Sequence, residues 1–395
     1  METDRIPRPE EAIRFLEKKI NVPTERWDDL KWGEHAHAFT VAHSVEANIL
    51  DDIHGRLNKA IASGESYDTW KKGMLGAMEQ AGWYGGSGHT KDDKKYISWR
   101  LRVIYDTNMR TAYAAAQYRK QLQEAAGRPV WLYKSKVYGD NRRQEHLALH
   151  NKAFRYDDSF WDTYYPPNGW GCQCYVTTKS ESGAEREGIT VEDSSGMELP
   201  DIDPTWQYNP GREALAPNFN KYKNLPQSAI TLAREKYRAD MEAVKITSGE
   251  LKVLRNEMIG QKPKRESEYA ENNPILYLAG NLDEARQKAM NINDSKIMIN
   301  GYRIFHGFSD KNAGQKLSEE HFEELYDLIQ NPDEIYENLR PNQPQFGREF
   351  HFAKKIKGGK ILNVVLRKLE RFALQIITFG RIGDDHGNKN YKKIW

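Results

Sequence analysis

The sequence is poor in cysteine and has no long apolar run. Only two of its 395 residues are cysteines, Cys172 and Cys174, which excludes a secreted scaffold held by several disulfides. No stretch of about 18 consecutive apolar residues occurs, so the sequence predicts neither a transmembrane helix nor a membrane partner. The charged start, Met-Glu-Thr-Asp-Arg, predicts no signal peptide. We therefore expect a protein kept in a reducing cytoplasm or in a particle assembled there.

The chain also lacks a strong net charge, because 59 basic and 57 acidic residues leave a formal charge of +2. This balance argues against a protein that coats nucleic acid along its whole length. The charge is uneven, however. From residue 351 to 395, eight Lys and three Arg outnumber two Asp and one Glu, a local excess of eight positive charges. Such a basic end suits RNA, DNA or an acidic partner, or it forms an ordinary solvated surface.

Hydrophobic periodicity predicts a helical amino-terminal part. Val41, Ile53 and Ile61 belong to a pattern that recurs every four residues, as on one face of a helix. Similar patterns, with glycine or proline at their ends, predict helices over residues 9–20, 41–63, 66–82 and 96–126.

The rest of the chain mixes strands and helices. Residues 130–133 and 136–138 look like hairpin strands, and residues 227–244 and 250–259 look like helices in a region of low apolar density. Towards the end, residues 319–330 suit a helix, and the runs 360–367 and 372–379 suit an antiparallel hairpin. The predicted class is α+β multidomain. Its predicted parts are a mainly helical region at 1–95, a small α+β module at 96–180, a connector with helical segments at 181–275, and a basic α+β domain with an antiparallel sheet at 276–395.

Four residues in the middle of the chain could bind a metal ion. His146 and His150 are four residues apart, which puts both on one face if the segment is helical. Cys172 and Cys174 follow, and two His with two Cys suit a closed tetrahedral zinc site. Two alternatives remain. The histidines form hydrogen bonds within the fold and the cysteines are small buried residues, or a cysteine is a nucleophile with a histidine as its base.

An aromatic and turn-rich segment leads into the two cysteines. It runs from Phe160-Trp161 through Pro166-Pro167-Asn168-Gly169-Trp170-Gly171 to Cys172-Gln173-Cys174. Its prolines fix an extended backbone and its glycines permit a turn. A rigid aromatic loop of this kind either packs in a core or forms a docking surface.

This segment, together with Arg142 and His146, resembles the phage Mu F-like minor head protein family. The resemblance extends over roughly residues 9–220, and it departs from the family at Gln173, where the family commonly has Arg. Further matching elements upstream and downstream are Trp27, Glu34-His35, residues 38–42, Gly82-Trp83, residues 105–108 and residues 206–211.

The resemblance implies a protein of head morphogenesis in a tailed bacteriophage. Such proteins enter the head in few copies, near the portal and inside the capsid. The implied partners are the portal, major capsid and scaffold proteins. The implied location is the virion, or the host cytoplasm during assembly. This role requires no cofactor and no active site, and zinc remains the one cofactor that the residues suggest.

Residues 276–395 resemble phage-borne relatives of the barnase, EndoU, colicin and RelE ribonuclease superfamily. The resemblance rests on residues 304–306, 317–319, 331–335 and 375–379. It implies metal-independent RNA cleavage, which needs a base, an acid and a cation for the phosphorane.

The residues available for that chemistry are His306, Arg348, His351, Lys354, Arg367 and Thr378, and the basic excess beyond residue 350 would hold the phosphates. His306 or His351 would be the acid or base, with Arg348 and Thr378 contacting phosphate. One alternative is an inactive relative that binds DNA or scaffold inside the head. Another is that the whole chain is a zinc-dependent enzyme.

Overall fold

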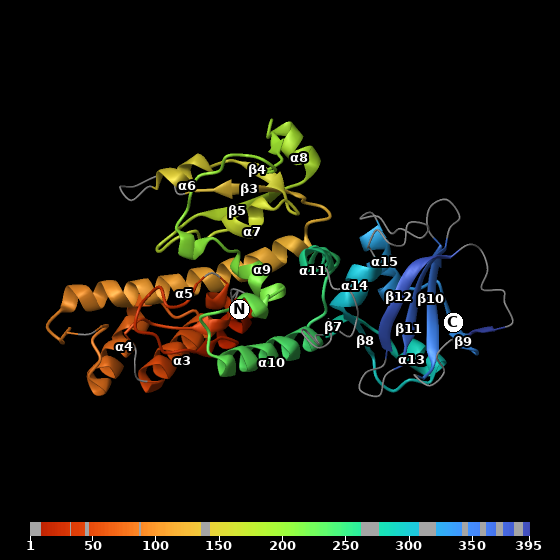
Figure 1. Cartoon of the computed structure of the whole chain (residues 1–395), viewed down its shortest axis with the longest axis horizontal. Coiled ribbons are helices and arrows are strands. Elements are labelled where there is room, and N and C mark those ends of the chain that lie inside the picture. Colours follow the sequence, from red (N-terminus) through yellow and green to blue (C-terminus); the bar gives the residue numbers. More distant parts are fainter. Residues whose placement is uncertain are drawn as a thin grey trace, which may run out of the picture. The chain divides into compact units, whose positions relative to one another are not determined.

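The computed structural model describes residues 9–31, 33–43, 47–86, 88–135, 143–261, 276–307, 321–341, 347–355, 361–368, 374–382 and 390–395. The chain divides into two compact units, Met1–Lys236 (unit 1) and Tyr237–Trp395 (unit 2). Each unit combines helices with a sheet (Figure 1). The predicted α+β multidomain class is therefore confirmed. Among the described residues, no helix is both long and apolar enough to cross a membrane.

Unit 1 begins with a group of helices that share one apolar core. Their inward faces carry Leu16, Ile53, Trp70 and Leu101, all of which are almost completely buried. Burying a side chain of this size contributes roughly 1.5–3 kcal/mol to folding. The helices are α1 (Glu10–Glu17), α2 (Glu34–His37), α3 (Ala47–Ser63), α4 (Tyr67–Ala81) and α5 (Lys94–Gln123).

The predicted helix at residues 41–63 begins later than its apolar pattern suggests. Val41 is buried, but it lies outside the helix, which starts at Ala47. Just before it, β2 (Ala38–Phe39) pairs in parallel with β1 (Ile20–Asn21), and Ala42 bridges to Thr24. The backbone of residues 38–42 is extended because it pairs with residues 20–24, although the spacing of the apolar residues fits a helix.

A four-stranded sheet follows in unit 1, with the order β5-β3-β4-β6. The central strand β3 (Val130–Lys134) pairs antiparallel with both β4 (Ala153–Arg155) and β5 (Tyr175–Lys179), while β6 (Val191–Glu192) pairs in parallel with β4. The strand predicted at residues 130–133 is confirmed. Its expected partner at 136–138 lies outside the described residues.

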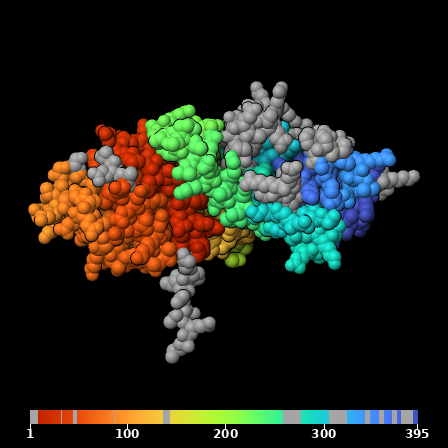
Figure 2. Space-filling view, turned by 90° about the horizontal axis from the view of Figure 1, so that it is seen from below, coloured from red at the N-terminus to blue at the C-terminus, as the bar shows by residue number. Residues whose placement is uncertain are grey.

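The last part of unit 1 packs back onto the amino-terminal helices. Asn224 donates a hydrogen bond from its backbone N–H to Glu34, and Lys236 donates to the carbonyl oxygen of Glu17. In the space-filling view the green segment lies directly against the red amino-terminal residues (Figure 2). The elements of this part are α8 (Glu181–Arg186), η1 (Pro204–Trp206), α9 (Pro210–Leu215), η2 (Phe219–Lys221) and the first part of α10 (Gln227–Ala243).

Unit 2 is built on a seven-stranded sheet with the order β13-β9-β10-β11-β12-β8-β7. The predicted hairpin is confirmed, because β11 (Ile361–Arg367) and β12 (Leu374–Ile382) pair antiparallel. The pairing of β12 with β8 is parallel. The other strands are β7 (Leu276–Asn281), β8 (Lys296–Asn300), β9 (Glu334–Asn338), β10 (Glu349–Lys355) and β13 (Tyr391–Lys393).

The end of α10 and four further helices complete the described part of unit 2, and α15 covers one face of its sheet. Leu325, Leu328 and Ile329 of α15 are buried, and Lys354 of β10 forms an ion pair with Asp327 of the same helix. The helices are α11 (Ser248–Gln261), α13 (Glu284–Met290), α14 (Gly301–Gly307) and α15 (His321–Gln330).

Candidate functional site

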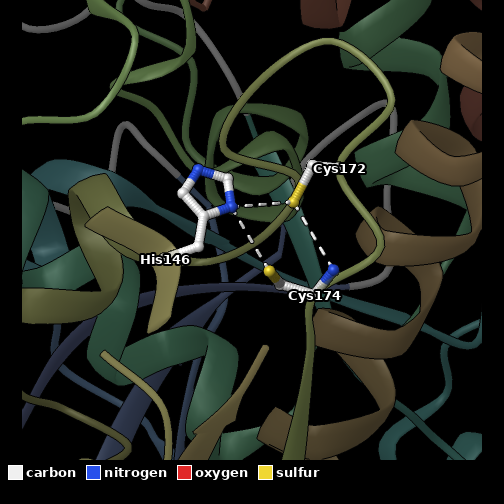
Figure 3. Close-up of side chains that lie close together, drawn as sticks. All are labelled: His146, Cys172 and Cys174. Carbon is white, nitrogen blue, oxygen red and sulfur yellow. Dashed lines mark hydrogen bonds between the residues drawn. The ribbon is translucent and has the colours of Figure 1, made fainter. Parts of the chain in front are cut away.

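One histidine and two cysteines converge inside unit 1. The Sγ atom of Cys172 lies 3.7 Å from Nδ1 of His146, and Sγ of Cys174 lies 3.4 Å from the same nitrogen (Figure 3). The three donor atoms lie within 4.8 Å of one another. His146 and Cys172 are buried and Cys174 is half-buried. We call these three residues the His–Cys–Cys cluster, and they are three of the four predicted metal ligands.

The fourth predicted ligand, His150, does not join this cluster. Helix α6 (Gln144–Ala148) carries His146 and ends before His150, so the two imidazoles do not share one helix face. The Nδ1 atom of His150 instead accepts a hydrogen bond from the backbone N–H of Ser135 at 3.1 Å. His150 therefore fixes the end of β3.

Hydrogen bonds hold the loop that carries the two cysteines. The backbone N–H of Cys174 points to Sγ of Cys172 at 3.5 Å, and Nη1 of Arg110 in α5 donates to the carbonyl oxygen of Cys172 at 3.3 Å. Gly171 precedes them with a φ of +69°, a conformation that strains any residue with a side chain. The turn thus requires the glycine, and it aims both sulfurs at one point.

The aromatic segment before the cysteines is mainly core. Phe160 and Trp161 in α7 (Phe160–Tyr164) are almost completely buried, and the Trp161 ring packs against Trp131 of β3. Asn168 is fully buried, and its Oδ1 accepts a hydrogen bond from the hydroxyl of Tyr133 at 3.0 Å. These contacts make the loop rigid, which answers the choice between core and docking surface in favour of core.

The cluster has unusual electrostatics. Hydrogen bonds from the Cys174 thiol, and then from the His146 ring, lower the pKa of Cys172 well below its ordinary value, although burial opposes them. Burial raises the pKa of Tyr133, which faces the two sulfurs, far above its ordinary range. A thiolate at Cys172 beside a neutral phenol is the charge state that a bound cation would favour.

The predicted catalytic residues of unit 2 are not all brought together. His351 lies within β10 and Arg348 just before it, and their odd separation puts them on opposite faces of the sheet. Arg348 packs over the ring of Phe350, and its Nε donates to Glu337 at 2.7 Å. Arg348 therefore lies on the other face of the sheet from His351, and the structure does not bring these two predicted residues together.

His351 instead belongs to a polar cluster on the other face of the sheet. Its Nε2 lies 3.3 Å from Oε1 of Glu349, and its Nδ1 lies 3.3 Å from Nδ2 of Asn363. Arg367 reaches Oε2 of Glu349 at 3.5 Å, and Tyr391 packs edge-on against the imidazole. Glu349 and Asn363 were not predicted, although their alternation with buried apolar neighbours marks them as sharing a face with His351 and Arg367.

The two other predicted residues are placed only by their backbone. His306 lies in α14, and Thr378 lies in β12 opposite Val365, which is itself opposite His351. The side chains of His306 and Thr378 lie outside the described part of the structure.

Some of the basic residues that were predicted to hold phosphates form ion pairs within unit 2. Lys354 pairs with Asp327, and Lys393 pairs with Glu334. Both lysines therefore have carboxylate partners within unit 2.

Part of unit 1 is similar to a known family. Residues 51–177 match the family model described as "Phage Mu protein F like protein". This match covers about a third of the chain and includes the His–Cys–Cys cluster. The resemblance predicted for roughly residues 9–220 is thus confirmed for residues 51–177. The match ends before unit 2, so the nuclease resemblance there stays a prediction.

Two curated relatives match at similar levels. The "Putative capsid assembly protein F" of Escherichia phage Mu is 34% identical over 193 residues, which are 47% of this chain and 44% of the relative. The "Mu-like prophage FluMu F protein" of Haemophilus influenzae is 37% identical over 179 residues, 45% of this chain and 43% of the relative. The chain thus spans less than half the length of these relatives. No solved structure matches the chain significantly.

Proposed function

We propose that this protein is a minor head protein of a tailed, Mu-like bacteriophage and acts in capsid assembly. The observation that carries the proposal is the match of residues 51–177, supported by a relative that is named for capsid assembly. The protein enters the head near the portal, and its partners are the portal, major capsid and scaffold proteins. It is present in the host cytoplasm during assembly and then inside the virion.

The surface of α5 supports a role that depends on protein contacts. Trp99 and Tyr113 expose 57% and 47% of their areas, although aromatic residues of this size are usually buried. They are 14 residues apart, which puts them about 40° apart around the helix. The ion pair of Arg102 and Asp106 lies between them. Exposed aromatic residues beside charges are typical of protein interfaces, and we assign this face of α5 to the portal protein.

Analysis of purified particles tests the proposal. Mass spectrometry should find the chain in intact particles, in fewer copies than the major capsid protein. Replacing Trp99 and Tyr113 together by Glu should reduce its incorporation, whereas Leu232→Glu, at an exposed position on α10, should not. Absence of the unmodified chain from particles and from assembly intermediates would overturn the proposal.

A second candidate function concerns unit 2, which we propose to act on RNA. The observation that favours it is the polar cluster of Glu349, His351, Asn363 and Arg367, because an imidazole next to a carboxylate, an amide and a guanidinium combines groups suited to proton transfer near a phosphate. In this proposal His351 takes the proton from a ribose 2′-hydroxyl as its oxygen attacks the phosphorus. The bond to the 5′-oxygen then breaks, that oxygen takes a proton from a water molecule, and His351 returns its own proton to the solvent.

Induced expression of the full chain in a bacterial host tests this activity. We expect cleavage of cellular RNA and arrested growth, both lost with His351→Ala and with Glu349→Gln. Arg348→Ala should keep the activity, because Arg348 faces the other side of the sheet. Circular dichroism of each variant shows whether it is folded. If the folded, unmodified chain leaves RNA intact, the catalytic proposal is wrong.

A further inference from the structure

A role in head assembly does not account for the His–Cys–Cys cluster of unit 1. Two sulfurs approach one ring nitrogen of His146, at 3.4 Å and 3.7 Å. We propose that His146, Cys172 and Cys174 bind one zinc ion, with water as the fourth ligand, and that this ion holds the cysteine loop against α6.

The spacing of the donor atoms fits such an ion. Zinc binds sulfur at about 2.3 Å and imidazole nitrogen at about 2.0–2.1 Å with tetrahedral angles, so the ligand atoms of one site are about 3.6 Å apart. The two distances between sulfur and nitrogen fall on either side of this value. All three donors can therefore reach one centre with only small adjustments.

Hydrogen bonding alone explains the same geometry less well. In a neutral imidazole Nδ1 carries either one N–H or one lone pair, so it makes one good hydrogen bond, yet two sulfurs face this atom. A disulfide between Cys172 and Cys174 would close a strained small ring. A single cation satisfies both sulfurs and the nitrogen at once.

The ligand set differs from the four residues suggested by composition. His150 is committed to the backbone of Ser135, and in the described part of the chain no further His, Cys or carboxylate joins the group. Zinc in proteins is usually four-coordinate, so three protein ligands leave one position open. We therefore assign the fourth position to water.

The ion would fix a loop that several elements share. Trp170, two residues before Cys172, packs edge-on against Trp206 and Trp27, and its carbonyl oxygen accepts a hydrogen bond from Arg143 at 2.5 Å. A bound ion would thus stabilise the contact between α6, the loop and η1. Its removal should loosen this part of unit 1 and leave unit 2 unaffected.

Metal analysis of the full chain, purified without a tag and without chelators, tests the proposal. We expect elemental mass spectrometry to find about one zinc ion per chain. Cys172→Ser and Cys174→Ser should each lose most of this zinc. His150→Ala is the matched control, because it removes a nearby imidazole outside the cluster, and it should keep the full amount.

X-ray absorption at the zinc edge of the unmodified chain makes the test independent of how the variants fold. We expect two sulfur ligands at about 2.3 Å together with nitrogen and oxygen at about 2.0–2.1 Å. Any of three results would overturn the proposal: a chain that contains no zinc and takes up neither zinc nor cobalt, a spectrum without sulfur ligands, or zinc loss in His150→Ala equal to that in Cys172→Ser.

Discussion

Lys19 is a buried amine in unit 1. Only 5% of the residue is exposed, and its Nζ lies 5.0 Å from the centre of the Phe15 ring. It lines a cavity of about 70 Å³ together with His35 and Arg100. Burial lowers the pKa of Lys19 to about 7. The charged form is therefore costly in the folded state, because it has left water without gaining a carboxylate partner among the described residues.

Lys19→Met should stabilise the protein most below neutral pH. In the unfolded state the pKa is about 10.5, so between about pH 7 and 10.5 the unfolded chain binds more protons, and the unmodified protein gains stability as pH rises. At about pH 6 we expect the variant to be more stable by on the order of 3 kcal/mol. Urea unfolding at about pH 6 and pH 9.5 checks this, and an equal difference at both would contradict it.

His37 should contribute to acid unfolding of unit 1. Burial lowers its pKa to about 3, and its Nε2–H donates to the carbonyl oxygen of Glu213 at 3.2 Å. Because the unfolded value is near 6.5, stability is lost as pH falls from about 6.5 towards 3. His37→Gln keeps a donor but does not titrate, so its urea midpoint should fall less between pH 7 and pH 4. An identical decline in both proteins would show that His37 is not involved.

For individual residues, the sequence predicted which residue types could form a site better than it predicted which of them lie together in the fold. The metal-binding potential of His146, Cys172 and Cys174 followed from their chemistry alone. His150 was predicted from its spacing, but α6 ends at Ala148, and no strong stop signal marks that end in the sequence. Glu349 was missed although its alternation indicates that it shares a face with His351, because its contact with Arg367 depends on the pairing of β10 with β11.

Among the helices, α9 depends on Asn209 at its start. Its Oδ1 accepts hydrogen bonds from the backbone N–H groups of Gly211 and Arg212, and its Nδ2 donates to the carbonyl oxygen of Trp161 at 2.9 Å. Asn209→Ala removes all three bonds at a buried position, so we expect a loss of about 2 kcal/mol. Chemical unfolding measures it, and a loss below the experimental error would contradict the assigned role.

Replacing glycine by alanine should change the stability in opposite directions at two positions of unit 1. At Gly211 in α9 a Cβ would lie 2.5 Å from Tyr118, so Gly211→Ala should destabilise unit 1 or displace α9 from α5. At the exposed Gly55 in α3 a Cβ meets no atom within 4 Å, so Gly55→Ala should stabilise by about 0.5–1 kcal/mol through helix propensity. Thermal unfolding of both variants checks the signs, and the same sign in both would contradict the packing shown by the structure.

Helices and a hairpin that show a local sequence pattern were predicted well, whereas the pairing of strands distant in the chain was not predicted. The periodicity of α3, α4 and α5 and the hairpin of β11 and β12 were visible in the sequence. The insertion of β3 between β4 and β5, and the parallel pair of β12 and β8, join segments far apart in the chain. Such pairing depends on tertiary packing, which propensity does not encode.

For the whole molecule, the division into Met1–Lys236 and Tyr237–Trp395 has a thermodynamic consequence. Each unit has its own sheet and its own buried residues. We expect calorimetry of the intact chain to show two transitions, and Lys19→Met should shift only one of them. One transition that moves as a whole with this substitution would show that the units unfold together. The predicted boundaries at residues 95, 180 and 275 stay predictions.

Because side chains alternate between the two faces of β10, substitutions on the two faces have different consequences. Phe350 and Phe352 lie on the face of the sheet that α15 covers. Replacing either by a smaller residue opens a cavity in the core and lowers the stability. Glu349 and His351 face the other side, where a substitution changes the chemistry of the buried polar cluster and spares the core beneath α15. Related chains could therefore keep the fold of unit 2 while its polar face evolves to a new ligand, or to none.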